Sequence, residues 1–119
     1  MFTAMRKASE HYKLNAAQQH AVFSTFSRFL SLIQGPPGTG KTTTAAAILH
    51  ANHELFPRVQ VCAASNMAVD ELLMRLVKAD VSVYRYGALS SISNEDLKIL
   101  QEHALEEIVD DQLNLSKKQ

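Results

Sequence analysis

The segment at residues 35–42 is the feature that most constrains how this chain can fold. It reads Gly-Pro-Pro-Gly-Thr-Gly-Lys-Thr, in which two glycines separated by four residues are followed directly by Lys and Thr. An apolar run at residues 30–34 precedes it, and a helix-like run at residues 42–49 follows it. A short buried strand, a glycine loop and a helix, in that order, form the context in which this pattern binds phosphate groups.

The residue types of this segment match the needs of a phosphate site. Glycines leave room for backbone N–H groups to surround an anion, and prolines stiffen the entrance to the loop. A helix that opens at Lys41 directs unpaired N–H groups and its positive dipole end at the same place. Lys41 would place a cation on the β and γ phosphates, and the Thr42 hydroxyl would ligate Mg²⁺; these two are the candidate catalytic residues. The candidate nucleotide-binding residues here are Gly35, Pro36, Pro37, Gly38, Thr39, Gly40, Lys41, Thr42 and Thr43. The alternative is a glycine-rich turn before an ordinary helix.

Composition narrows the class of protein. With 119 residues and 46% hydrophobic residues, the chain is at most one globular domain. Its 12 basic and 12 acidic residues cancel, so it has no global basic signature of a nucleic-acid binder, although a local groove remains open. The single Cys62 lies in an apolar run, which predicts a buried, reduced thiol and a cytoplasmic or nuclear protein. No apolar stretch approaches the ~20 residues that span a bilayer, so we expect no membrane partner.

Alternating strands and helices predict an α/β domain with a mainly parallel sheet. Residues 1–13 are interpreted as a tail, and Asn15 is placed as the N-cap of a helix whose apolar face reaches Phe29. Further helices are expected over residues 41–54, 67–78 and 95–113, and strands over residues 30–34, 59–64 and 81–86.

Three segments in order resemble superfamily 1 RNA/DNA helicases of the regulator-of-nonsense-transcripts and senataxin type. They are Leu-Asn-Ala-Ala-Gln at 14–18, the loop at 34–42, and Val-Cys-Ala-Ala-Ser-Asn-Met-Ala-Val-Asp at 61–70. The similarity runs over residues 14–87, about three-fifths of the chain. The two prolines of the loop and the Ser-Asn-x-Ala-Val-Asp run indicate this branch. Ala64 departs from the family, which usually has Pro at that position.

The resemblance implies a P-loop NTPase fold of the RecA-like type, with a parallel sheet flanked by helices. It also implies the cofactors ATP and Mg²⁺, and single-stranded RNA or DNA as a partner. Gln18 would read the adenine edge through its side-chain amide, which can donate and accept at once. Ser65 and Asn66 would contact the nucleic-acid backbone at a helix start. The alternatives are a solvated helix residue for Gln18 and plain helix caps for Ser65 and Asn66.

The acidic residues that hydrolysis requires are missing from the expected places. A Walker B acid follows an apolar strand, yet none of the three predicted strands ends in Asp or Glu. The Ile-Val-Asp-Asp run at 108–111 has helical spacing and is interpreted as a helix with solvated acids. Asp70 and Glu71 are interpreted as surface charges, and Arg85 as a solvated charge at a strand end.

We therefore expect residues 14–119 to be an incomplete RecA-like domain, without Walker B and without the second RecA-like domain. The strands that carry the acids normally lie between the strand at 30–34 and the strand at 59–64, so these two would lack neighbours. The first hypothesis is the ATP-binding portion of an ATP-dependent helicase that is inactive by itself. The alternative is a non-catalytic nucleotide-binding fragment or a degenerate helicase remnant. A small phosphotransferase would require an acid near the phosphates and a substrate lid, and the sequence indicates neither.

Overall fold

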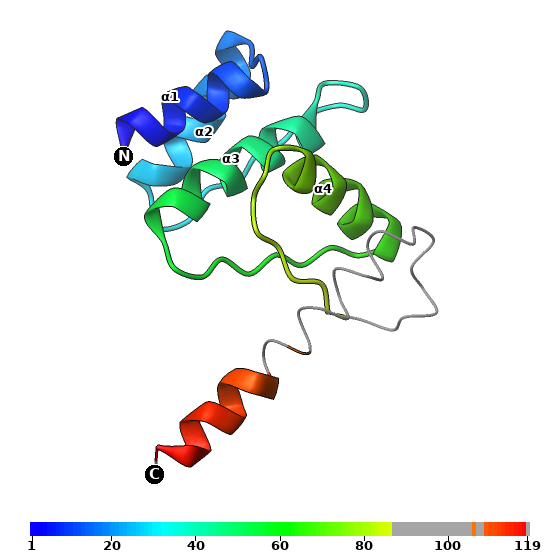
Figure 1. Ribbon diagram of the computed structural model, residues 1–119. Helices are drawn as coiled ribbons and strands as arrows, with labels where there is room; N and C mark the ends of the chain where they lie inside the picture. Colours follow the sequence, from blue (N-terminus) through cyan, green and yellow to red (C-terminus); the bar gives the residue numbers. More distant parts are fainter. Residues whose placement is uncertain (87–105, 107–108, 119) are drawn as a thin grey trace.

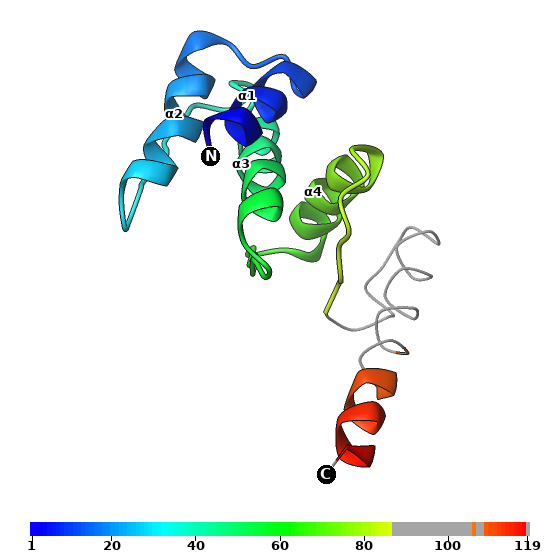
Figure 2. The same ribbon diagram turned by 60° about the vertical axis from the view of Figure 1, so that its left-hand side comes forward.

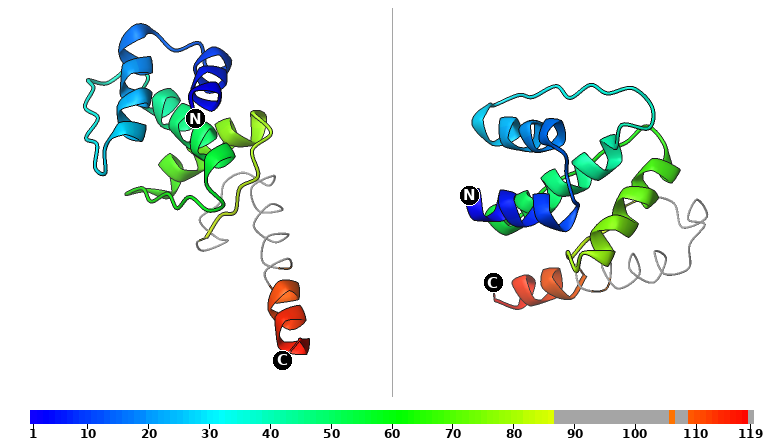
Figure 3. Two further views of the ribbon diagram at one scale, coloured as in Figure 1. Left: turned by 90° about the vertical axis from the view of Figure 1, so that its left-hand side faces the viewer. Right: turned by 90° about the horizontal axis from the view of Figure 1, so that it is seen from above.

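The structure is a computed structural model that describes residues 1–86, 106 and 109–118, and four helices joined by extended connections make up residues 1–86. The helices are α1 (Phe2–His11), α2 (Ala16–Ser27), α3 (Lys41–Leu55) and α4 (Asn66–Lys78). α3 is central, since it contacts the α1 and α2 pair on one side and α4 on the other (Figures 1 and 3). Residues 109–117 are also helical and lie apart from these four helices (Figure 2).

The small side chains of α3 allow it to occupy the centre. Ala46, Ala47 and Ala51 are fully buried, and small residues let neighbouring helices approach closely. Two apolar clusters form on its opposite sides. The first cluster joins α3 to α1 and α2, and the second joins it to α4 and the chain after α4. Their buried members are Met5, Ala8, Leu14, Val22, Ala47 and Ala51 in the first cluster, and Ala46, Leu76 and Val81 in the second.

The first thirteen residues differ from the tail that we expected, because residues 2–11 form α1. Met5 and Ala8 are buried against α3, and their spacing of three residues places them on one helix face. The charged residues Arg6, Lys7 and Glu10 lie between and beyond them and are exposed. The charged residues make the short apolar face of α1 difficult to recognise in the sequence. Such a short helix becomes stable only when α3 covers its apolar face.

The strand predictions for residues 30–34, 59–64 and 81–86 are not met in this structure. These residues are extended, but the described part of the chain contains no β-ladder. An extended segment becomes a strand only by pairing with a neighbour, and the residues that the structure describes include no strand beside the first two segments. Their apolar side chains are consequently exposed, with 74% of Leu30, 91% of Leu32 and 45% of Val59 accessible to solvent.

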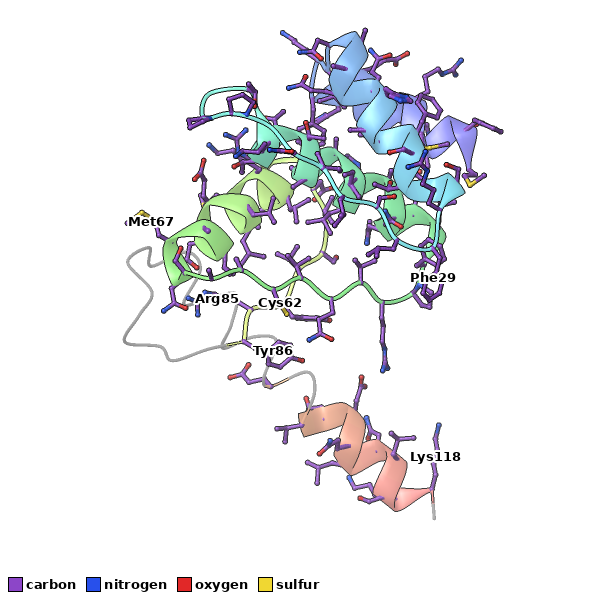
Figure 4. The ribbon with its side chains drawn as sticks, turned by 180° about the vertical axis from the view of Figure 1, so that it is seen from behind. Phe29, Cys62, Met67, Arg85, Tyr86 and Lys118 are labelled. Atoms are coloured by element: carbon purple, nitrogen blue, oxygen red, sulfur yellow. The ribbon has the colours of Figure 1, made fainter. Side chains whose placement is uncertain are left out.

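Two single-residue expectations were also wrong. Phe29 lies beyond the end of α2 and is fully exposed rather than part of its apolar face (Figure 4). Cys62 lies on the extended segment between α3 and α4 and is exposed, because among the described residues this segment joins no sheet that would bury it (Figure 4).

The C-terminal helix that we expected over residues 95–113 falls largely outside the described residues. The part that is described is helical over residues 109–117, and Asp110 and Asp111 are exposed there. This confirms the interpretation of these two acids as solvated groups on a helix. Within the described ranges, no helix combines the length and the apolar character needed to cross a membrane.

Candidate nucleotide-binding site

The phosphate loop has a backbone that only glycine adopts readily at two of its positions. Gly38 has φ +80° and Gly40 has φ +78°, both in the left-handed region. Gly40 is also the N-cap of α3, which begins at Lys41 as the sequence predicts. The loop therefore turns sharply through its two later glycines and passes directly into a helix N-terminus.

The loop closes on itself through Thr39. Its backbone N–H and its hydroxyl both donate to the Pro36 carbonyl, at 3.4 Å and 2.6 Å. A Cβ added at Gly35 would lie 2.7 Å from Thr39 Oγ1 and 3.2 Å from Lys41 Cγ. Because Gly35 has no side chain, the side chains of Thr39 and Lys41 can occupy the space beside it. A loop with glycines at these positions, followed by a lysine at a helix start, is the kind of loop that binds phosphate groups.

The first turn of α3 supplies unpaired donors beside this loop. Thr44 closes the turn, because its N–H and its hydroxyl donate to the Gly40 carbonyl at 2.9 Å and 3.0 Å. The preceding N–H groups, of Lys41, Thr42 and Thr43, have no intrahelical acceptor, as at any helix start. Lys41 itself is exposed, and the described residues form no ion pair with it. The arrangement can receive an anion and a bound cation.

Gln18 reaches the same loop from the start of α2. Its side-chain oxygen accepts from the Asn15 N–H, and its own N–H donates to Asn15 Oδ1, both at 2.9 Å. This capping box confirms Asn15 as the N-cap. Gln18 Nε2 then donates to the Thr39 carbonyl at 3.1 Å. The structure thus brings Gln18 and the loop together, and the Gln18 amide keeps one further N–H and a second lone pair on its oxygen.

Arg75 is a residue of this site that sequence reasoning missed. It projects from α4, and its Nη1 donates to Thr43 Oγ1 at 3.0 Å. Its Nη2 lies 3.5 Å from Glu71 Oε1 in a solvent-exposed ion pair. The helical spacing of α4 predicted its apolar face but gave no signal for a cross-helix hydrogen bond from a polar position.

The start of α4 holds the two residues that we expected to contact nucleic acid. Ser65 is the N-cap, and its Oγ accepts from the Ala68 N–H at 3.2 Å, which confirms its interpretation as a cap. Asn66 is the first helical residue and is exposed. Met67 follows with 81% of its surface accessible and projects from this end of α4 (Figure 4). Gln18 and the loop therefore lie together at the start of α3. Ser65 and Asn66 lie at the start of α4, and Arg75 lies near the other end of that helix.

Asp70 and Arg85 are not the surface charges that we expected. Arg85 Nε lies 2.7 Å from Asp70 Oδ1, and the two side chains are only 2% and 12% exposed. This buried ion pair ties α4 to the extended segment at residues 81–86. Each residue alone looked solvated because the partner that neutralises it is distant in sequence.

A second polar cluster lies at the junction of α1 and α3. The rings of His11, Tyr12 and His50 contact one another edge to face, with centroids 4.8–5.7 Å apart. Burial lowers the pKa of His50, and the charge of His11 lowers it further. Burial raises the pKa of Tyr12, and the charge of Arg75 partly opposes that shift. No group of three metal-ligating side chains occurs in the part of the chain that the structure describes.

The family described as AAA domain matches residues 13–119. The ATP-dependent helicase upf1 of Schizosaccharomyces pombe is 45% identical over 85 residues, which cover 66% of this chain and 9% of that protein. The ATP-dependent helicase NAM7 of Saccharomyces cerevisiae is 45% identical over 87 residues, which cover 72% of this chain and 9% of that protein. A regulator of nonsense transcripts 1 homolog of Arabidopsis thaliana is 48% identical over 79 residues, which cover 66% of this chain and 6% of that protein.

These comparisons confirm the resemblance to helicases of the regulator-of-nonsense-transcripts type. The chain spans less than a tenth of the length of these three relatives. No solved structure matches it.

Proposed function

Because the chain belongs to the AAA-domain family, we propose that it is the ATP-binding portion of a superfamily 1 helicase. In the intact protein this portion would couple ATP hydrolysis to movement along single-stranded RNA or DNA. The observation that carries the proposal is the loop at residues 35–42, with its two left-handed glycines, its direct entry into α3 and its hydrogen bond from Gln18.

The residues that would hold Mg-ATP are those of the loop and of the first turn of α3. The loop backbone and the opening N–H groups of α3 would bind the phosphates, and Lys41 would neutralise their charge. Thr42 would supply its hydroxyl to Mg²⁺, and Gln18 would face the adenine with the donor and acceptor that it keeps free. Mg²⁺, when bound, would neutralise the negative charge that develops on the phosphates.

The remaining parts of the proposal concern the intact protein. Ser65 and Asn66 would contact the backbone of single-stranded nucleic acid, since the cap leaves other donors of the α4 start available. The segments at residues 30–34, 59–64 and 81–86 would become parallel strands of a RecA-like sheet once their neighbours are supplied. A second RecA-like domain would complete the ATP site. We place the intact protein in the cytoplasm or nucleus, which agrees with its single Cys62.

The alternative is a non-catalytic nucleotide-binding fragment. It is favoured by the surroundings of the loop, because no Asp or Glu of the described residues forms an ion pair or hydrogen bond with residues 35–43. Hydrolysis needs acids that hold Mg²⁺ and activate water. We expect the chain by itself to bind Mg-ATP without turnover.

Calorimetry with Mg-ATP tests the proposal on the full chain. The wild type is expected to bind, and Lys41→Ala is expected to bind at least tenfold more weakly, because it loses the cation that faces the phosphates. Lys78→Gln, which removes an exposed cation from α4, is the control and should bind like the wild type. A folded wild type that shows no heat of binding would refute the proposal. Nucleic-acid-stimulated ATPase activity that is lost in Lys41→Ala would refute the expected lack of turnover.

A further inference from the structure

The Thr43 hydroxyl is held in an unusual way for a threonine at a helix start. Thr44, its neighbour, donates its hydroxyl proton to the Gly40 carbonyl, and Thr39 donates to the Pro36 carbonyl. Thr43 Oγ1 instead accepts from Arg75 Nη1 at 3.0 Å in a partly buried position. Among the contacts of the described residues, no acceptor takes the Thr43 hydroxyl proton.

A hydroxyl oxygen that accepts a hydrogen bond from a guanidinium can still donate its own proton to another acceptor. The lone pair in use fixes the rotation of the hydroxyl, and hydrogen bonds in a chain polarise one another. The positive donor strengthens this effect, since charge-assisted hydrogen bonds are stronger than neutral ones. Arg75 therefore makes Thr43 a better donor toward whatever anion lies at the first turn of α3.

The position of Arg75 shows that this contact is more than an ordinary surface pair. The ion pair with Glu71 is long, at 3.5 Å, and both side chains are substantially exposed, so it contributes little to holding the guanidinium. The contact to Thr43 crosses from α4 to α3 and reaches the residue directly after Lys41 and Thr42. Arg75 thus connects the helix that begins at Ser65 to the turn that follows the phosphate loop.

We infer that Arg75 is a positioning residue of the nucleotide site: it holds Thr43 Oγ1 as an acceptor and so directs the Thr43 hydroxyl proton to a phosphate oxygen of the bound nucleotide. This inference rests on the proposed function, because it requires a nucleotide at the loop. It makes α4 a structural link between the nucleotide and the Ser65 end of the same helix. Arg75 acts through Thr43 and does not itself touch the nucleotide.

A double-mutant cycle on the full chain tests this. Arg75→Met removes the donor with little loss of side-chain length, and Thr43→Val removes the hydroxyl at similar volume. Mg-ATP affinity is measured by calorimetry, adenosine binding by saturation-transfer NMR, and folding by circular dichroism. Each single variant is expected to bind Mg-ATP about tenfold more weakly, the scale of one charge-assisted hydrogen bond. The double variant is expected to be no weaker than either single one, because both remove the same contact.

The controls separate positioning from a general effect on folding or charge. Lys78→Gln removes another exposed cation of α4 and should leave both affinities unchanged. Adenosine has no phosphate, so its binding should not change in Arg75→Met or Thr43→Val. Arg75→Lys keeps the charge and a donor and should restore part of the Mg-ATP affinity. Should Arg75→Met not fold, Arg75→Lys and Arg75→Gln take its place in the cycle.

The outcomes distinguish this inference from the proposed function. Wild-type affinity in Arg75→Met, an equal loss for adenosine, or effects that add in the double variant would overturn the role of Arg75. In each of these cases Lys41→Ala would still weaken Mg-ATP binding, and the proposed function would stand. If the folded wild type bound no Mg-ATP at all, the proposed function would fail and this inference with it.

Discussion

Removing the negative charge of Asp70 should strongly destabilise the fold, although Asp70 lies outside the phosphate loop. Asp70→Asn keeps the shape of the side chain but removes the carboxylate charge that lies 2.7 Å from the Arg85 guanidinium, whose side chain is 2% exposed. Removing one charge of a buried ion pair costs far more than removing one charge of an exposed pair. We expect a loss of about 3–5 kcal/mol in the free energy of unfolding.

The geometry of the pair supports this magnitude. Two unit charges 2.7 Å apart attract each other by about 6 kcal/mol at an effective dielectric constant of about 20. Desolvation of both groups offsets much of this attraction, so the intact pair contributes little net stability. When only the charge of Asp70 is removed, its attraction to Arg85 is lost, whereas the desolvation cost of Arg85 remains. Replacing both residues, as in Asp70→Leu with Arg85→Met, should therefore recover most of the loss.

Urea unfolding followed by circular dichroism measures these differences. Glu71→Gln is the matched control, because it removes the adjacent acid of an ion pair that is 58% and 40% exposed; its effect should stay below about 1 kcal/mol. A small domain has only about 5–15 kcal/mol of stability, so an Asp70→Asn chain that is mostly unfolded would agree with the reasoning. A loss below about 1 kcal/mol for Asp70→Asn, or a double variant as unstable as the single one, would refute it.

Two further predictions concern the loop and the histidine cluster. Gly40→Ala should lose about 1 kcal/mol of stability through its left-handed φ and should also weaken Mg-ATP binding, because its Cβ would lie 2.5 Å from Gln18 Nε2. Gly38→Ala has the same strain with nothing within 4 Å, so equal Mg-ATP affinities in the two variants would contradict the role of Gln18. Burial, the largest cause, lowers the pKa of His50, so the unfolded chain binds more protons and stability should fall as pH drops below about 6.5. In urea titrations between about pH 7 and 5, the stability of His50→Phe should change less with pH than that of the wild type. His53→Gln, at an exposed position, is the control and should keep the wild-type dependence. An unchanged dependence of stability on pH in His50→Phe would contradict the prediction.

The features that the sequence predicted correctly are local ones. The Asn15 cap, the Ser65 cap and the start of α3 at Lys41 each depend on hydrogen bonds within a few residues. Their side chains need no distant partner to adopt the observed conformation, so the residue pattern is sufficient to place them. The glycines at 38 and 40 belong to the same class, because their backbone conformation excludes most other residues.

The features that the sequence did not predict depend on partners far along the chain. The sequence predicted solvated charges at Asp70 and Arg85, which the fold brings together, and gave no signal for the contact of Arg75 with Thr43. The segments at residues 30–34 and 59–64 have the composition of strands, but pairing requires neighbours that the described residues do not supply. The same reasoning explains why α1 was missed, since its small apolar stripe is recognisable only against α3.

α4 is the element in which these distant contacts meet. Asp70 fixes it to the segment at residues 81–86, and Arg75 fixes it to the first turn of α3. Between Ser65 and Arg75 the helix is uninterrupted, and a helix transmits a displacement of one end to the other because its backbone hydrogen bonds resist bending. If a nucleotide drew Thr43 toward its phosphates, Arg75 would follow, and the Ser65 end of α4 would move with it. The contact between Arg75 and Thr43 thus connects the start of α3, where the nucleotide site is proposed, to α4, which begins at the proposed nucleic-acid contacts Ser65 and Asn66.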